Sequence, residues 1–186
     1  MASPAPRRRH PEATRAALLE AARLEFEDPG YDATHTNRIA ARAGFAPQTF
    51  YRHFPDKAAI FLAVYRLWTE KELDLLEEAQ DAAGAAAVLI ASHRASLNFR
   101  RALRTLSLTD PAVRAARVES RKLQIQRLQA RSPHLAGLGF ARLSADLLTL
   151  ERLADACAEG EFGDLGVPEY AAKVILTEAI RRAFGP

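Results

Sequence analysis

The stretch RIAARAGFAPQTFYRHF, residues 38–54, constrains the fold of this chain more than any other part of it. It begins as an alanine-rich amphipathic segment, is interrupted at Gly44 and Pro47, and ends in adjacent aromatic and basic side chains. Glycine readily adopts positive φ, and proline is tolerated in the first turn of a helix. The stretch therefore predicts two short helices, over about residues 36–43 and 47–53, that are joined by a tight turn.

The second of these helices has two faces of different chemistry. At 100° per residue, Phe50 and Phe54 share one side, where Ile39 of the first helix is available as a partner. Gln48 and Arg52 lie on the opposite side. A helix-turn-helix needs this division, because its apolar side fixes the second helix against the first while the other side enters a major groove of DNA. Arg52 is accordingly expected near the phosphates.

The rest of the chain also predicts helices, because apolar residues recur at intervals of three and four and no alternating strand pattern persists. The predicted fold class is therefore all-α. Capping residues, prolines and glycines place the helices at about residues 14–26, 36–43, 47–53, 56–80, 85–106, 110–131, 140–159 and 168–184.

Composition limits the class of protein. The single cysteine, Cys157, excludes an internal disulfide, which is typical of a reducing cytoplasm. The longest apolar stretch, residues 82–91, is far shorter than the roughly 18 residues of a membrane span, and the basic N-terminus lacks the apolar segment of a signal peptide. We therefore expect a cytoplasmic protein without a membrane partner.

The sequence also offers little for catalysis. It contains no glycine-rich phosphate loop, no nucleophile elbow and no HExxH helix, so no enzyme activity is expected. His93 and His134 have no carboxylate or thiol beside them in the sequence to complete a metal site, and we expect surface or packing roles for both. No metal and no cofactor are predicted.

Charge is distributed unevenly along the chain. Residues 94–131 carry a net charge of +8, which follows an acidic run on the preceding long helix. The members of this run are Glu70, Glu72, Asp74, Glu77, Glu78 and Asp81. We expect the arginines of the basic segment to be exposed to water or to pair with this run, and an anionic ligand is the alternative.

The sequence GYDATHTNRIAARAGFAPQTFYRHFPDKAAIF, with RAALLEAARLEF before it, resembles the N-terminal DNA-binding domain of the tetracycline-repressor (TetR) family. The resemblance covers about residues 14–61 and rests on threonine, Ile-Ala, Ala-Gly and Tyr-x-His-Phe-x-x-Lys elements at family spacing. It implies an all-α homodimer of about nine helices, three that bind a near-palindromic operator in double-stranded DNA and about six that bind a small molecule and dimerise. The expected domains are a flexible basic arm at residues 1–13, a helix-turn-helix domain at 14–55, and an effector-binding and dimerisation domain at 56–186.

The resemblance also implies roles for individual residues. It assigns phosphate contacts to Thr36, Tyr51, His53 and Lys57. It assigns base contacts to Pro47, Gln48 and Thr49. Two residues depart from the family pattern: Ala46 replaces a serine or threonine, so the hydroxyl cap is absent, and Gln48 replaces a common glycine and adds a side chain that can bond to adenine.

The basic arm leaves two interpretations open. Arg7, Arg8 and Arg9 form either a solvated tail or a contact with phosphate or with an adjacent minor groove.

Apolar stripes on the last two helices predict a dimer interface. The residues concerned are Leu143, Leu147, Leu150, Ala154, Ile175, Leu176, Ala179 and Ile180. Two such faces from each subunit can close a four-helix bundle about a two-fold axis. The alternative is that a stripe packs only inside its own subunit.

Two serines interrupt an apolar stripe on the helix expected at residues 85–106. Small residues on a bulky face either let a neighbouring helix approach closely or leave room for a ligand, and an aromatic wall on the facing helix favours the ligand. The expected effector pocket consists of Val64, Tyr65, Trp68, Ser92, Ser96 and Phe99.

Together these features predict a homodimeric DNA-binding transcriptional regulator, a repressor that a small-molecule effector of unknown identity releases from its operator. The alternative is a dimeric DNA-binding architectural or partner-recruiting protein that binds no effector. About 120 residues beyond the helix-turn-helix exceed what a dimerisation hairpin needs, which favours the first.

Overall fold

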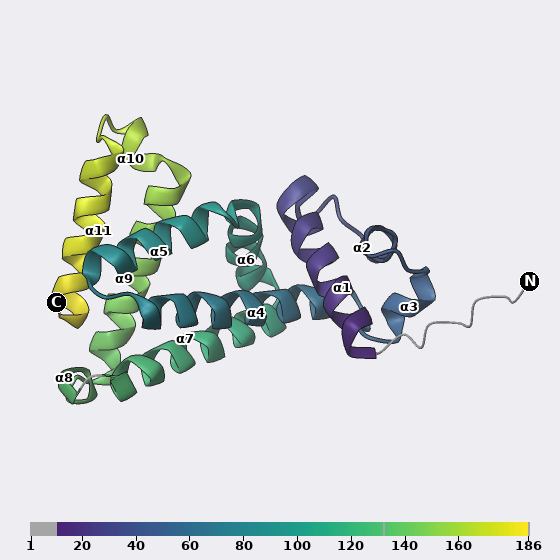
Figure 1. The fold of residues 1–186 in the computed structure, drawn as a ribbon, viewed down its shortest axis with the longest axis horizontal. Helices are drawn as coiled ribbons and strands as arrows, with labels where there is room; N and C mark the ends of the chain where they lie inside the picture. The colour runs from purple at the N-terminus through teal and green to yellow at the C-terminus, as the bar shows by residue number, and fades with distance from the viewer. Residues whose placement is uncertain (1–10, 132, 186) are drawn as a thin grey trace, which may run out of the picture. The chain divides into compact units, whose positions relative to one another are not determined.

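The computed structural model describes residues 11–131 and 133–185, and within these residues it consists of helices and the turns between them (Figure 1). The described chain forms two compact units that meet in sequence between Tyr65 and Arg66. Arg7, Arg8 and Arg9 of the expected basic arm lie outside the described residues.

The smaller unit contains three helices and the beginning of a fourth. Its elements are α1 (Pro11–Glu25), a short π-helical turn (Phe26–Gly30), α2 (Thr36–Arg42), α3 (Pro47–Tyr51) and the first part of α4 (Lys57–Glu78). Figure 1 shows α1, α2 and α3 in purple and blue. The two short helices begin at the predicted residues, and α3 ends two residues earlier than expected because Arg52 already occupies its C-cap.

Aromatic side chains fill the interior of the smaller unit. Phe26, Phe50 and Phe61 are fully buried, and the ring of Phe61 lies 5.2 Å from that of Phe26 and 4.9 Å from that of Tyr31. These edge-to-face contacts join the end of α1 to α4. Burying a side chain of this size stabilises a fold by about 1.5 to 3 kcal/mol.

The turn between α2 and α3 follows the chemistry that the sequence predicts. Gly44 has a φ of +76°, where a side chain would be strained although space around its Cα is open. The backbone N–H of Phe45 donates to the carbonyl of Ala40 at 2.9 Å and closes the turn. Ala46 caps α3 without a side-chain hydrogen bond, as expected from its missing hydroxyl, and Pro47 begins the helix.

The larger unit holds the remainder of α4 and the later helices. These are α5 (Ala82–Arg94), α6 (Leu97–Thr109), α7 (Pro111–Arg131), α8 (Pro133–Ala136), α9 (Phe140–Glu159), α10 (Glu161–Asp164) and α11 (Glu169–Phe184). Within the described chain the α-helices run from α1 to α11, and α8 and α10 have four residues each. Without these two single turns, the count agrees with the expectation of about nine.

A core of small and branched side chains joins α5, α9 and α11. Ala86 and Ala154 are fully buried, and Ile90, Leu150 and Leu176 pack around them. Alanines at such positions let helix backbones approach closely. In Figure 1 these three helices lie together, while α7 runs beside the later part of α4.

The helix expected at residues 85–106 is in fact two helices. α5 ends at Arg94, and Ser96 adopts a non-helical conformation (φ −142°, ψ 33°) at the N-cap of α6. Its hydroxyl donates to the carbonyl of Ser92 at 2.8 Å. Serine competes for backbone hydrogen bonds in this way and therefore favours helix ends. The stripe containing Ser92 and Ser96 consequently does not lie on one helix face.

Candidate DNA-binding site and the buried cluster of the larger unit

Helix α3 has two faces of opposite character. Phe50 and Phe54 are buried, and their rings lie 5.9 Å apart. Of the expected DNA-contacting residues in this region, Pro47, Gln48, Tyr51 and Arg52 are exposed, and Thr49 and His53 are half-buried. The helix thus has the inner apolar side and outer polar side that the sequence predicts.

A hydroxyl pair links the start of α2 to the end of α3. The hydroxyl oxygens of Thr36 and Tyr51 lie 2.9 Å apart, at hydrogen-bond distance, and the Tyr51 side chain is exposed. Each hydroxyl has one proton to donate. Because one proton is used within the pair, a single hydroxyl proton remains for a group outside the protein, such as a phosphate oxygen.

The structure gives Lys57 a role inside the protein. Its ammonium group donates to the carbonyl of Tyr31 at 2.9 Å and to that of Thr34 at 3.0 Å, and it lies 4.0 Å from the Tyr31 ring centroid. Burial lowers the pKa of Lys57, against the opposing effect of Asp32. Lys57 therefore fixes the segment before α2 with two of its three N–H donors.

The buried carboxylate of Glu25 pairs with two of the arginines that make this segment of the sequence positively charged. Glu25 at the end of α1 is 2% exposed and pairs with Arg38 and, at 2.5 Å, with Arg42 of α2. The hydroxyl of Thr34 donates to the backbone carbonyl of Glu25 at 2.9 Å. These contacts hold α2 against α1, so part of the positive charge of this segment serves the fold. No motif in the sequence indicates this pairing.

The residues expected to form the effector pocket fall in both units. Val64 and Tyr65 are buried in the smaller unit, and Phe99 is buried in the larger one. Trp68 and Ser92 are half-buried. The Ser92 hydroxyl donates to Oε2 of Glu72 at 2.5 Å, so both expected hydroxyl anchors already bind protein atoms.

Behind these serines lies a cluster of buried ionisable side chains from four helices. Glu72 of α4 is 7% exposed, His93 of α5 is 1% exposed, and Asp155 of α9 is 4% exposed. His93 Nε2 lies 3.7 Å from Oε2 of Glu72, and His93 Nδ1 lies 3.0 Å from Oδ1 of Asp155. Arg100 of α6 donates to the same Asp155 oxygen at 2.6 Å. His93 therefore has a packing role, one of the two expected for it, but the two carboxylates that face it come from other helices and are not apparent from its neighbours in the sequence.

The two acids of this cluster have different electrostatic environments. Burial opposes ionisation of Asp155, but His93 and Arg100 outweigh it and hold the pKa of this carboxyl well below its usual range. Burial raises the pKa of Glu72, and His93 and the Ser92 hydroxyl offset this only in part. The guanidinium of Arg100 also lies 4.9 Å from the Trp68 ring centroid.

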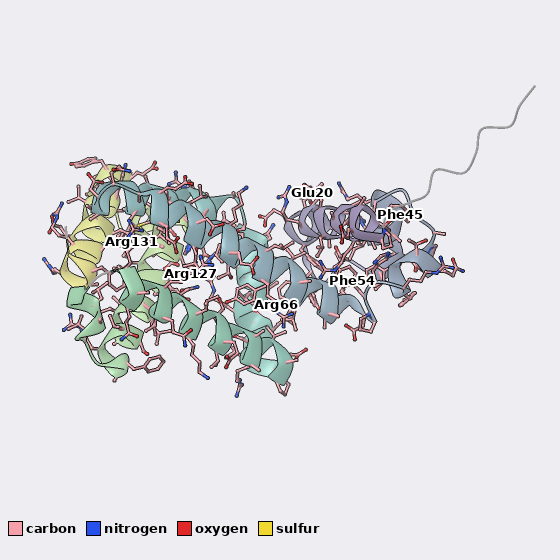
Figure 2. The ribbon with its side chains drawn as sticks, turned by 60° about the horizontal axis from the view of Figure 1, so that its bottom comes forward. Glu20, Phe45, Phe54, Arg66, Arg127 and Arg131 are labelled. Carbon is pink, nitrogen blue, oxygen red and sulfur yellow. The ribbon has the colours of Figure 1, made fainter. Side chains whose placement is uncertain are left out.

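Most arginine partners come from α9 and not from the acidic run of α4. Arg104 pairs with Asp155 and Glu159 at 2.6 and 2.5 Å. Arg121 pairs with Glu151 at 2.5 Å. The expected pairing with α4 holds for Arg127, which reaches Asp74 at 3.3 Å and Glu77 at 3.4 Å. Figure 2 labels Arg127 and Arg131, and Arg131 donates to backbone carbonyls of α4.

Most of the apolar residues expected at a dimer interface pack inside the core of a single chain. Leu150, Ala154, Leu176 and Ile180 belong to the core shared with α5, and Leu143 packs against Ile125 and Leu135. This corrects the prediction for those residues, since a side chain in its own core cannot face a partner. Leu147 and Ala179 are half-buried, and Ile175 is 42% exposed. The exposed apolar side chains of α9 and α11 are Phe140, Leu148, Tyr170, Val174 and Ile175.

A surface hollow of about 500 Å³ lies at the turn between α6 and α7. Its lining residues are Leu108, Thr109, Pro111, Arg114, Ala115, Val118 and Glu119. None of these belongs to the expected effector pocket. Among the described helices, none combines the length and apolar character needed to cross a membrane, and residues 11–131 and 133–185 contain no group of three potential metal ligands.

Comparison with known proteins finds a family match for part of the smaller unit. Residues 18–64 match the family "Bacterial regulatory proteins, tetR family". No curated protein sequence matches the chain.

Solved structures share the fold over nearly the whole chain. A TetR family transcription regulator from Marinobacter aquaeolei VT8 is 21% identical, covers 90% of this chain and 95% of its own, and superposes with a TM-score of 0.56. A transcriptional regulator from Rhodococcus sp. Rha1 is 22% identical, with 95% and 98% covered and a TM-score of 0.65. A protein from Saccharomonospora viridis, proposed as a transcriptional regulator and solved in complex with choline, is 21% identical, with 91% and 96% covered and a TM-score of 0.65. The chain therefore has the fold of a TetR-family transcriptional regulator and carries the N-terminal helix-turn-helix DNA-binding domain of the tetR family.

Proposed function

We propose that this protein is a homodimeric transcriptional repressor that binds a near-palindromic operator and leaves it when a small-molecule effector binds the larger unit. The observation that carries the proposal is the two-sided helix α3. Buried Phe50 and Phe54 hold its inner side, and exposed Gln48 and Arg52 are available on the outer side. A recognition helix requires this arrangement.

Within this proposal, side chains around α3 divide into readers of sequence and contacts to the backbone. Gln48 reads a base, most simply adenine, with Pro47 and Thr49 beside it. The hydroxyl pair of Thr36 and Tyr51 supplies a phosphate contact, and Arg52 and His53 add positive charge or a hydrogen-bond donor nearby. Phosphate contacts set the position of the helix, whereas the base contact sets specificity.

Dimerisation would use the outer sides of α9 and α11. Exposed Leu148, Val174 and Ile175 provide apolar area on these helices, and half-buried Leu147 and Ala179 lie next to it in sequence. A dimer joined by such a surface would carry two copies of α3 for one operator, whose successive major grooves lie about 34 Å apart.

The larger unit is the proposed effector site. Two observations support a ligand: the size of this unit, and the choline complex of the protein from Saccharomonospora viridis with the same fold. Trp68, Ser92 and Phe99, all in this unit, are the candidate lining. The alternative, a DNA-binding architectural protein without effector, predicts that no metabolite changes either thermal stability or operator affinity.

The test of DNA recognition begins with selection of bound sequences from a random DNA pool. Gln48→Ala should then cost about 1 to 3 kcal/mol of binding free energy at one base pair of each half-site and relax the preference there. Glu119→Ala, a change on the exposed face of α7, serves as the matched control. Equal loss on selected and scrambled DNA for Gln48→Ala would contradict base reading.

A further inference from the structure

In the larger unit, the buried imidazole of His93 lies between two carboxylates. Its Nδ1 atom faces Asp155 at 3.0 Å and its Nε2 atom faces Glu72 at 3.7 Å. The contact with Asp155 is a close ionic one without hydrogen-bond alignment. A neutral imidazole has a single N–H, so one of its nitrogens would present a lone pair to a carboxylate oxygen.

The surrounding charges decide which of the three groups holds a proton. Asp155 is ionised, because Arg100 and Arg104 both donate to it at 2.6 Å. The ionised Asp155 therefore favours the tautomer of His93 that has its proton on Nδ1, the ring nitrogen 3.0 Å from this carboxylate. A second proton can lie on Nε2 of His93 or on the Glu72 carboxyl. Without it, the Nε2 lone pair would lie opposite an ionised carboxylate inside the core.

Glu72 differs from the other buried acids of the larger unit in its partners. Among the described residues, no arginine lies within ion-pair distance of Glu72, whose partners are the Ser92 hydroxyl and His93. In contrast, buried Asp155 pairs with Arg100 and Arg104, both at 2.6 Å. The more distant charges that act on Glu72 are Arg100, which favours its ionised form, and Glu151, which disfavours it.

We propose that Glu72 and His93 together bind one proton in the core of the larger unit, and that loss of this proton on going to alkaline pH weakens the contact between α4 and α5. The proton belongs to the pair and lies on Nε2 of His93 or on the Glu72 carboxyl. When it leaves, an ionised Glu72 faces the lone pair of His93, and the Ser92 hydroxyl and the more distant Arg100 offset this only in part.

This pair is also a point at which pH acts on regulation, if the protein is the repressor proposed above. Helix α4 runs without interruption from Lys57, in the smaller unit, past Glu72. A change in the contact between α4 and α5 therefore acts on the helix that leads to the DNA-binding unit.

The direction of the pH effect follows from linkage. Burial raises the pKa of Glu72, but in the unfolded chain His93 carries the one proton of this pair up to its ordinary pKa of about 6.5, so the folded state binds more protons only above that pH. The stabilisation is thus fully present below about pH 6.5 and is lost as pH rises through the folded-state pKa of the pair. The slope of unfolding free energy against pH in this window should correspond to about one proton.

The experiment measures this slope for the full-length protein by chemical denaturation between pH 5 and 9. Glu72→Gln keeps the shape of the side chain without its charge and should remove most of the slope. Glu119→Gln, which removes an exposed carboxylate that pairs with Lys122, should leave it unchanged. A slope that persists in Glu72→Gln would overturn the proposal.

A second measurement uses the wild-type protein and so does not depend on a variant that folds. Nitrogen-15 chemical shifts of the wild-type imidazoles report protonation of each ring nitrogen. We expect the Nε2 shift of His93 to change in the window where stability falls if this nitrogen holds the shared proton, and the carboxyl carbon-13 shift of Glu72 to change there if the glutamate holds it. If neither shift changes in that window, the arrangement is refuted.

Operator affinity over the same pH range then tests regulation separately. Wild-type protein should show a pH dependence that Glu72→Gln lacks. If both proteins bind the operator with equal pH dependence while their stabilities differ, the proton site stands and its regulatory role fails. If neither binds any selected DNA, the proposed function itself fails.

Discussion

The two units of this chain handle charge in different ways. In the smaller unit, aromatic and aliphatic side chains fill the interior, and the buried acid Glu25 pairs with arginines that are 40% or more exposed. In the larger unit, Glu72, His93, Arg100 and Asp155 are all buried together. The first arrangement leaves the outer side of a short helix available for contact, whereas the second joins four helices through charges that water cannot screen.

The difference predicts which substitutions destabilise each unit most. Loss of a buried ionic partner leaves an uncompensated charge and is more damaging than loss of an exposed one. Loss of a buried ring leaves a cavity. The following substitutions separate these cases.

Asp155→Ala should have the largest effect. It leaves the buried guanidinium of Arg100 and the ring of His93 without their counter-charge, at a cost of about 3 to 5 kcal/mol in unfolding free energy. Because the pKa of Asp155 is lowered, its contribution is present at neutral pH and is lost as pH falls below its ordinary value of about 3.9. The loss should therefore shrink in acid, as measured by denaturation at pH 7 and pH 3.5.

The control for that prediction is an exposed pair. Arg94→Ala removes a contact with Glu169 whose side chains are 45% and 72% exposed, and it should cost less than about 1 kcal/mol. Similar losses for Arg94→Ala and Asp155→Ala would show that burial does not distinguish the charges of the larger unit.

Phe50→Ala should cost about 3 kcal/mol, because it empties a fully buried site in the small core beneath α3. Hydrogen exchange should report faster opening of residues 36–54 and little change in α9. Gln48→Ala, on the exposed side of the same helix, should leave exchange unchanged. Uniform acceleration through both units would mean that they do not unfold separately.

Lys57→Met separates an internal role from a DNA contact. It removes the two hydrogen bonds to the carbonyls of Tyr31 and Thr34 and should cost about 1 to 2 kcal/mol of stability in the absence of DNA. If Lys57 acts only at phosphate, stability stays constant and the salt dependence of binding flattens by about one unit of slope.

The hydroxyl pair of α2 and α3 gives the smallest expected effect. Thr36→Val and Tyr51→Phe each remove one hydroxyl from the pair that is 2.9 Å apart. Since either hydroxyl alone still has one proton to donate outward, the single variants should lose little operator affinity, and the double variant should lose more than their sum, by about 0.5 to 1 kcal/mol. Strictly additive losses would mean two independent phosphate contacts.

The features of this chain that its sequence predicts correctly are local ones. The start of α2, the turn at Gly44 and the two faces of α3 all follow from residues within one or two helical turns of each other. The single helix predicted at residues 85–106 is wrong, because the helical pattern continues through Ser96 although the helix does not. Whether Ser96 adopts this N-cap conformation depends on the hydrogen-bond partner of its hydroxyl, which the pattern of apolar residues does not indicate.

What the sequence determined by itself is the helical class of the fold and the helix-turn-helix, since periodicity and turn chemistry act over a few residues. Only the tertiary structure decided which charges meet. Arg100 and Asp155 are 55 residues apart, and the apolar stripes of α9 and α11 contain no indication of whether they pack on α5 or on another copy. Helix periodicity fixes which side of a helix is apolar, but the partner of that side depends on how all helices pack at once.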